Sequence, residues 1–184
     1  MRIRLFVALV IPDETKNQIK KIRKKIFPDE GKLRWEDDSK IHLTLKFIGE
    51  VKENLLEPIT KELNFLEHFQ NINCTIEKFG FFFKAKDEPR ILWLGLNLDK
   101  SLYLIVEELN QRLSKFQIAF ENRKFKAHLT LLRIKNDVPK DFISKFSSAE
   151  IPENNFIANE IVLMKSELSS NGSTYKEIKK YYLK

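Results

Sequence analysis

The sequence predicts an α+β fold in which antiparallel sheet predominates. Strand-like runs of apolar residues are interspersed with amphipathic helical segments along the 184-residue chain. The sequence has none of the glycine-rich strand-to-helix turns that mark nucleotide-binding parallel folds. The tetrapeptide His-Leu-Thr-Leu occurs twice, at 42–45 and 128–131. This spacing is nearly half the chain, so it indicates two similar lobes that each supply one strand to a common cleft.

Four segments have the apolar periodicity of helices: 13–27, 53–66, 101–116 and 139–146. In the third segment Ser101 is the predicted N-cap. Its predicted inward face consists of Leu102, Ile105, Val106, Leu109 and Leu113.

Seven segments are predicted to be strands: 2–10, 41–48, 72–79, 91–98, 125–134, 156–168 and 175–182. The chain has only five glycines and six prolines, and it lacks a Gly/Ser-rich linker. We therefore expect mostly regular structure with short turns, in one bilobal domain that spans residues 1–184.

Composition excludes several classes of protein. No apolar run approaches the roughly 20 residues that cross a bilayer, and the N-terminal run is too short for a signal peptide. Cys74 is the single cysteine, so it forms no intramolecular disulfide and no thiolate cluster for zinc. We expect a cytoplasmic protein without a membrane segment.

The net charge is +7, from 33 Lys and Arg against 26 Asp and Glu. Such an excess favours polyanionic partners through steering and counterion release. A lysine-rich proteome or the charged surface of a thermophile's protein accounts for the charge equally well. The charge is therefore compatible with a phosphate substrate but does not identify one.

The two tetrads carry the candidate chemistry. Side chains alternate across a strand, so His42 and Thr44 share one face, as do His128 and Thr130, while the leucines anchor the other face. Hydrolysis of a phosphate ester needs a base for the attacking water and an acid for the leaving oxygen. Histidine can serve in either protonation state near neutral pH, and threonine hydroxyls can donate to the non-bridging phosphate oxygens.

A single His-x-Thr on a strand is usually a partly buried histidine beside a residue that favours β structure. Here two identical tetrads hold two of only three histidines, so we favour a functional role. His68 has no such neighbours and is expected at the surface. Neither tetrad has a carboxylate or thiolate at metal-ligand spacing, and the sequence lacks a phosphate-binding loop and a nucleophile elbow. We expect no metal and no cofactor.

At these residues the chain resembles the two-histidine (2H) phosphoesterase superfamily, and most of all its RNA 2′,3′-cyclic phosphodiesterase branch. The likeness runs nearly from end to end. It comprises residues 4–9, 33–35, 42–49, 90–95, 125–131 and 165–168, followed by Gly172 and Tyr175. One difference is Ala127, where a proline commonly precedes the second histidine.

The resemblance implies two pseudo-symmetric lobes around a central cleft, with helices packed outside. It also implies metal-independent hydrolysis of RNA 2′,3′-cyclic phosphate ends to 2′-phosphates. In that reaction His42 is the proton donor to the departing 3′ oxygen, and His128 accepts the proton of water. Reverse 2′–5′ RNA ligation is a related possibility.

Five further residues are candidates for base stacking or phosphate contact in the cleft: Arg34, Trp35, Lys46, Arg133 and Tyr175. Strict alternation puts Lys46 on the His42 face, where a cation near phosphate and a solvated edge are equally good interpretations. The same rule puts Arg133 opposite His128. We expect core packing for Phe47 and Phe125.

The expected partners are RNA with 2′,3′-cyclic phosphate ends, including tRNA-like fragments, or cyclic nucleotides, bound by a monomer. Two alternatives stay open. One is a non-catalytic RNA- or nucleotide-binding module. The other is an enzyme of the same superfamily that acts on another small cyclic phosphate, such as a cyclic nucleotide or ADP-ribose cyclic phosphate.

Overall fold

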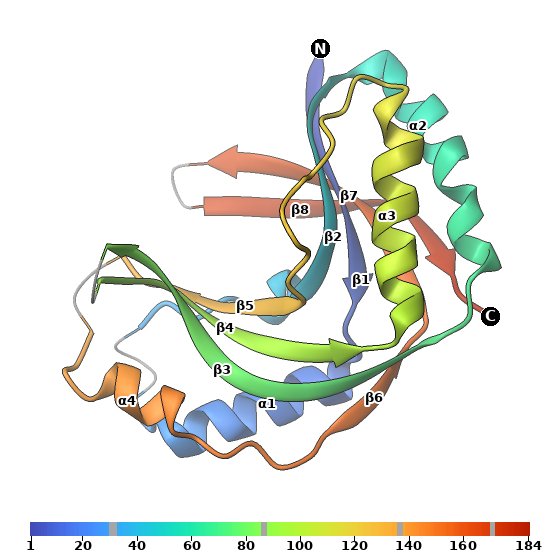
Figure 1. Cartoon of the computed structure of the whole chain (residues 1–184). Coiled ribbons are helices and arrows are strands. Elements are labelled where there is room, and N and C mark those ends of the chain that lie inside the picture. The colour runs from blue at the N-terminus through green and yellow to red at the C-terminus, as the bar shows by residue number, and fades with distance from the viewer. Residues whose placement is uncertain (30–32, 86–87, 136–137, 170–171) are drawn as a thin grey trace.

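The computed structural model describes residues 1–29, 33–85, 88–135, 138–169 and 172–184. Its strands form two four-stranded antiparallel sheets (Figure 1). The first sheet has the order β2-β1-β7-β8, with β1 (Arg2–Val10), β2 (His42–Lys52), β7 (Glu160–Ser169) and β8 (Gly172–Tyr182). The second has the order β5-β4-β3-β6, with β3 (Ile72–Ala85), β4 (Glu88–Leu98), β5 (His128–Arg133) and β6 (Asn155–Ala158). The predicted α+β fold with two lobes is confirmed.

The helices cover the outer side of each lobe. In Figure 1, α1 (Asp13–Ile26) and α4 (Phe142–Ser147) lie beneath the second sheet, while α2 (Leu56–Glu62) and α3 (Lys100–Ser114) lie beside the first. Thus α1 follows a strand of the first sheet but lies under the second, and α3 follows a strand of the second but contacts β2 of the first. This exchange links the lobes, and buried side chains of both sheets belong to one continuous apolar core.

Local sequence explains the two long helices. In α1, acidic residues occupy the first turn and basic residues the last, which complements the helix dipole. The predicted inward residues of α3 are all buried. Its N-cap is Asp99, and the predicted cap Ser101 lies within the first turn. No helix among the described residues is long and apolar enough to cross a membrane.

Several predicted elements differ from the structure only in their bounds: β3 continues to Ala85 beyond the predicted 72–79, and β5 begins at His128 within the predicted 125–134. Two others differ in kind. The single strand expected at 156–168 is two strands, β6 and β7, which pair with β3 and β1 in different sheets. Apolar residues continue on both sides of Asn159, so periodicity gives no sign of this crossing. The helix expected at 53–66 is α2 flanked by 3-10 helices, η3 (Glu53–Leu55) and η4 (Leu63–His68); a further 3-10 turn is η2 (Asp38–Lys40).

Both tetrad strands contain a β-bulge at the same position. In β2, Thr44 pairs with Ala8 and Lys46 pairs with Val7, so Leu45 is the extra residue. In β5, Thr130 and Leu132 pair with consecutive residues of β4, so the extra residue lies between them as well. A bulge inserts one residue and reverses the alternation beyond it. The two lobes therefore share not only the tetrad sequence but also a β-bulge at the same place in the tetrad strand.

The bulges correct two expectations. Phe47, expected in the core, has 66% of its surface exposed and lines the cleft. Arg133, expected opposite His128, also lines the cleft. In each strand the two residues that follow the threonine are both buried. The side chain after them, Phe47 in β2 and Arg133 in β5, therefore returns to the face that carries the histidine.

Candidate active site

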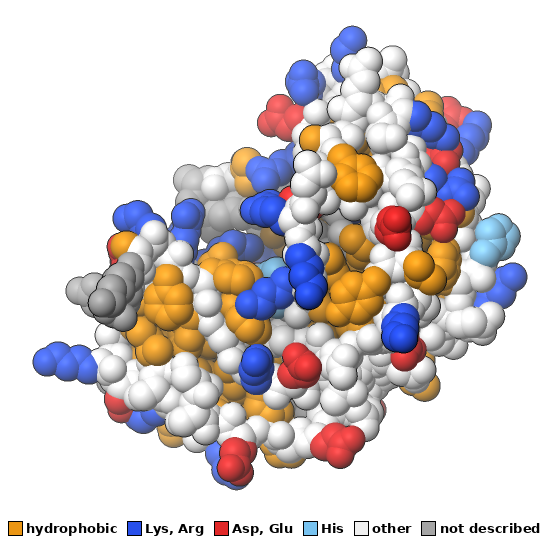
Figure 2. Space-filling model, in the orientation of Figure 1, with side chains coloured by type: hydrophobic (Ala, Val, Ile, Leu, Met, Phe, Trp, Pro, Cys, Tyr) orange, Lys and Arg blue, Asp and Glu red, His pale blue; other side chains and the backbone are white. Residues whose placement is uncertain are grey.

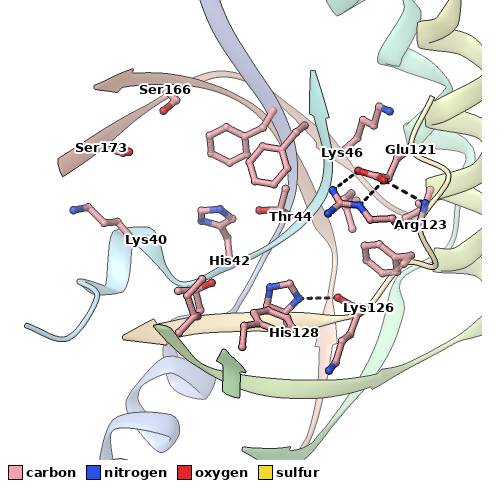
Figure 3. A pocket seen from close by; sticks show the side chains of 18 of the residues that line it. Lys40, His42, Thr44, Lys46, Glu121, Arg123, Lys126, His128, Ser166 and Ser173 are labelled. Carbon is pink, nitrogen blue, oxygen red and sulfur yellow. Dashed lines mark hydrogen bonds and ion pairs between the residues drawn. The ribbon is translucent and has the colours of Figure 1, made fainter. Parts of the chain in front are cut away.

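The tetrads meet in a cleft between the two lobes, where β2 and β5 are in contact. The cleft has a volume of about 800 Å³, and His42, Thr44, His128 and Thr130 all line it. Figure 3 shows His42 and Thr44 on one strand with His128 on the other, their side chains extending toward the same space. In Figure 2, Lys and Arg side chains gather around this hollow; those that line the cleft include Arg4, Lys40, Lys126 and Arg133.

His42 is held between aromatic rings. Phe6 of β1 stacks on the imidazole with a centroid distance of 5.1 Å, and Tyr175 of β8 meets it edge-on at 5.4 Å. Burial, with smaller effects of the Arg133 and Lys16 charges, lowers the pKa of His42 to about 4. Its Nδ1 is buried and has no hydrogen-bond partner among the described residues. In the free protein His42 is therefore neutral near pH 7.

His128 is oriented by the backbone. Its Nδ1 lies 2.7 Å from the carbonyl oxygen of Lys126. A carbonyl only accepts, so Nδ1 carries the proton and Nε2 of the neutral ring keeps its lone pair. Burial lowers the pKa of His128, the Lys126 hydrogen bond opposes this, and the charges of Lys126 and Arg133 lower it further. The ring is thus prepared to accept a proton at Nε2.

Two glycines make room for the Trp93 ring beside His128. The Trp93 ring lies 6.3 Å from the imidazole, and a Cβ added at Gly80 would come within 2.2 Å of the indole. A Cβ at Gly95 would lie 3.2 Å from the same ring. Phe82 meets His128 edge-on at 5.0 Å. Glycine is therefore required at position 80 for the indole to pack edge-on beside His128.

Arg133 is positioned by an acidic partner that the sequence did not single out. Its Nε donates to Oε1 of Glu36 at 2.9 Å, and Glu36 also lines the cleft. The backbone places Glu36 there, because its N–H donates to the Leu131 carbonyl and the preceding Trp35 forms a β-bridge with Leu132. The positive charge of Arg133 contributes to lowering the pKa of both histidines, so its charge is felt at both imidazoles.

Trp35 and Arg34 lie elsewhere. Trp35 packs against Phe142 and Phe146 of α4, with the Arg23 guanidinium 4.3 Å from the ring centroid. Arg34 is exposed, and neither residue is among the described residues that line the cleft. The structure thus brings Arg133 and Tyr175 to the histidines, but not Arg34 or Trp35.

Lys46 is buried, with 5% of its surface exposed. Its ammonium donates to Oδ1 of Asn110 and to the carbonyl oxygen of Ala119, both at 2.6 Å. Burial lowers its pKa, and the charge of Glu121 opposes that effect. Lys46 is among the residues that line the cleft, but its ammonium is bound by Asn110 and Ala119, which differs from both interpretations of the sequence.

Other residues of the cleft carry no pattern that would identify them from sequence. They include Phe6, Phe82, Lys40, Ser166 and Ser173. Phe6 and Phe82 belong to apolar strand runs, where an aromatic residue is expected to be part of the core. His68 is exposed, as predicted. The described residues include no group of three or more His, Cys, Asp or Glu placed to hold a metal ion.

The depressed histidine pKa values lead to a prediction about pH. Because both lie below 6.5, kcat/KM, which reports the free enzyme, is expected to have its maximum below pH 6.5. NMR titration should place His42 near pH 4, and saturation with a 2′-nucleotide should raise both pKa values because an anion favours imidazolium. An optimum above pH 7 together with an ordinary His42 titration would contradict this electrostatic account.

Comparison with known families matches residues 9–93 and 96–175 to the family described as LigT like phosphoesterase. An RNA 2′,3′-cyclic phosphodiesterase of Methanocaldococcus jannaschii is 32% identical over 183 residues, which cover 97% of this chain and 100% of the relative. The protein of the same description from Thermotoga maritima is 30% identical over 175 residues, covering 95% of this chain and 92% of the relative.

Two solved structures have a similar fold. TT0787 of Thermus thermophilus has a TM-score of 0.79 at 22% identity, with 97% of both chains covered. Escherichia coli LigT complexed with 3′-AMP has a TM-score of 0.76 at 25% identity, covering 100% of this chain and 99% of LigT. The resemblance drawn from the sequence is confirmed: the chain belongs to the LigT-like phosphoesterase family, within the two-histidine superfamily.

Proposed function

We propose that this chain hydrolyses 2′,3′-cyclic phosphates at RNA ends to 2′-phosphates, without a metal ion. The observation that carries the proposal is the placement of two His-x-Thr strands in one basic cleft, with His128 held in the tautomer of a base. Relatives named RNA 2′,3′-cyclic phosphodiesterase support the substrate. The complex of Escherichia coli LigT with 3′-AMP supports a nucleotide as ligand.

In the proposed reaction His128 is the base. Water attacks phosphorus, and its proton passes to Nε2 of His128 while the new P–O bond forms. The hydrogen bond from Nδ1 to the Lys126 carbonyl keeps the ring in position and stabilises the imidazolium as it develops. The tautomer that the backbone selects supports this role.

His42 is the proposed acid. As the bond from phosphorus to O3′ breaks, a protonated His42 gives its proton to O3′, leaving a 3′-hydroxyl and a 2′-phosphate. With a pKa of about 4, roughly one free molecule in a thousand carries that proton at pH 7. The anionic substrate offsets the charges of Arg133 and Lys16, so binding itself raises the pKa of the acid.

The remaining polar residues hold the phosphate. Thr44 and Thr130 share the histidine face and can each donate a hydroxyl hydrogen bond to a non-bridging oxygen. Arg133, steadied by Glu36, adds positive charge as charge develops on those oxygens. The leucines between these residues are buried and fix both strands in the core. Tyr175 supports the His42 ring from its edge.

A substrate panel tests this function. The protein, treated with EDTA, is assayed with 2′,3′-cyclic nucleotides, cyclic-phosphate-ended RNA, 3′,5′-cyclic nucleotides and ADP-ribose cyclic phosphate. We expect turnover of the 2′,3′-cyclic compounds and none of the 3′,5′-cyclic ones. Turnover that collapses with EDTA and returns only with added metal would refute the metal-free mechanism. Binding without turnover would favour a recognition module. Incubating an RNA that ends in a 2′,3′-cyclic phosphate with an RNA that begins with a 5′-hydroxyl tests for 2′–5′ ligation, in which the 5′ oxygen attacks phosphorus in place of water and O3′ leaves.

A further inference from the structure

We propose that segment 119–126, the wall of the cleft that leads into β5, binds the single-stranded RNA upstream of the terminal cyclic phosphate. This inference rests on the proposed function and adds the part of the substrate that the histidines do not touch. In Figure 1 the chain leaves the end of α3, passes in front of β2 and reaches β5. Seven of the eight residues of the segment line the cleft: Ala119, Phe120, Glu121, Arg123, Lys124, Phe125 and Lys126.

The segment presents aromatic rings to the cleft. Phe120 is 52% exposed, and Phe125 is half-buried with an edge contact to Tyr103 at 6.0 Å. From the opposite strand, Phe47 also lines the cleft and is 66% exposed. Exposed phenylalanines on both walls contribute little to the core, but they offer flat faces on which bases of any sequence can stack.

Cations lie between these rings. Lys124 is exposed, and the Lys126 ammonium lies 4.0 Å from the centroid of the Trp93 ring. Arg123 is held by Glu121 through contacts of 2.8 and 2.9 Å, which offset its charge but fix the plane of its guanidinium. Three cations against one carboxylate leave the wall positive. Basic residues interleaved with aromatic ones are the pattern that binds a single nucleic-acid strand.

The wall is pinned from behind, although it has no regular secondary structure. The buried ammonium of Lys46 donates to the Ala119 carbonyl and to Asn110, and the same Asn110 oxygen accepts the backbone N–H of Glu121. Figure 3 shows Lys46 beside the Glu121–Arg123 pair. A surface fixed before binding loses less entropy when a flexible strand is ordered on it. Lys46 is therefore a positioning residue for the RNA-binding wall.

The proposal predicts a dependence on RNA length. A cyclic mononucleotide reaches the histidines but leaves the wall unused, whereas a pentanucleotide with the same cyclic end covers it. We expect the pentanucleotide to have the higher kcat/KM in the wild type. Phe120→Ala should reduce the pentanucleotide-to-mononucleotide ratio of kcat/KM by about 5- to 150-fold, the range expected for loss of one base-stacking contact. Lys124→Gln should reduce the salt dependence for the pentanucleotide only.

Phe83→Ala is the matched control, because Phe83 is 50% exposed and is not among the described residues that line the cleft. It should keep the wild-type ratio. A wild type that hydrolyses both substrates with equal kcat/KM, or a Phe120→Ala variant that keeps the ratio, would overturn the RNA-binding wall while leaving the proposed function intact. A wild type that hydrolyses neither would instead count against the proposed function.

Discussion

His42→Ala and His128→Ala are each expected to reduce kcat for a 2′,3′-cyclic phosphate by about 10²–10⁴-fold, the range for loss of general acid–base help. The two rings act on one transition state from opposite sides of phosphorus, so removing either should cost nearly as much as removing both. Steady-state kinetics of the two single variants and the double variant, each at its own pH optimum, measure this.

His68→Ala is the matched control, since His68 is the third histidine of the chain and is exposed on η4. It should retain wild-type kcat. Because Phe6 stacks on His42, thermal unfolding of each variant shows whether the fold survives, and His42→Gln keeps more of the side-chain volume. A folded His42 or His128 variant with near-wild-type turnover would eliminate the two-histidine mechanism.

A substrate with sulfur in place of the 3′ bridging oxygen is expected to rescue His42→Ala far more than His128→Ala. A thiolate leaves with little protonation, so the acid becomes dispensable, whereas attack by water still needs its base. The assay compares kcat for the sulfur and oxygen substrates in each variant. We expect the sulfur-to-oxygen ratio of kcat to rise by up to about 10²-fold in His42→Ala and to stay near the wild-type value in His128→Ala.

The surroundings of the two histidines support the assignment of His42 as the acid and His128 as the base, which the identical tetrads alone cannot distinguish. His128 has a carbonyl acceptor at Nδ1, whereas Nδ1 of His42 has no partner among the described residues. Identical sequences therefore place their two imidazoles in different hydrogen-bonding surroundings. Rescue of His128→Ala instead of His42→Ala would exchange the two roles and would mean that the Lys126 hydrogen bond does not select the base.

The sequence predicts well what depends on local pattern. The repeated tetrads identify the two strands that meet in the cleft, and alternation correctly puts His42 and Thr44 on one face and His128 and Thr130 on another. The bounds of β1 agree with the predicted strand, and the inward face of α3 is as predicted.

What the sequence does not predict depends on pairing between distant segments. The bulges that bring Phe47 and Arg133 into the cleft arise from the register of β2 on β1 and of β5 on β4. The hydrogen-bond partners of Lys46 lie 64 and 73 residues further along the chain. Arg133 and its partner Glu36 are 97 residues apart. Charged residues have no periodicity that reports such contacts, so the sequence alone allows Lys46 to be interpreted only as a cation near phosphate or as a solvated edge residue.

The central claim is that two histidines open a 2′,3′-cyclic phosphate at O3′, and the product of a single reaction tests it most directly. Cyclic-phosphate-ended RNA is incubated with the EDTA-treated protein in ¹⁸O-labelled water, and the product is examined by ³¹P NMR and mass spectrometry. The account predicts a 2′-phosphomonoester that carries one ¹⁸O, formed by the wild type and absent with the double variant of His42 and His128. A 3′-phosphomonoester, or the same product from the folded double variant, would contradict it.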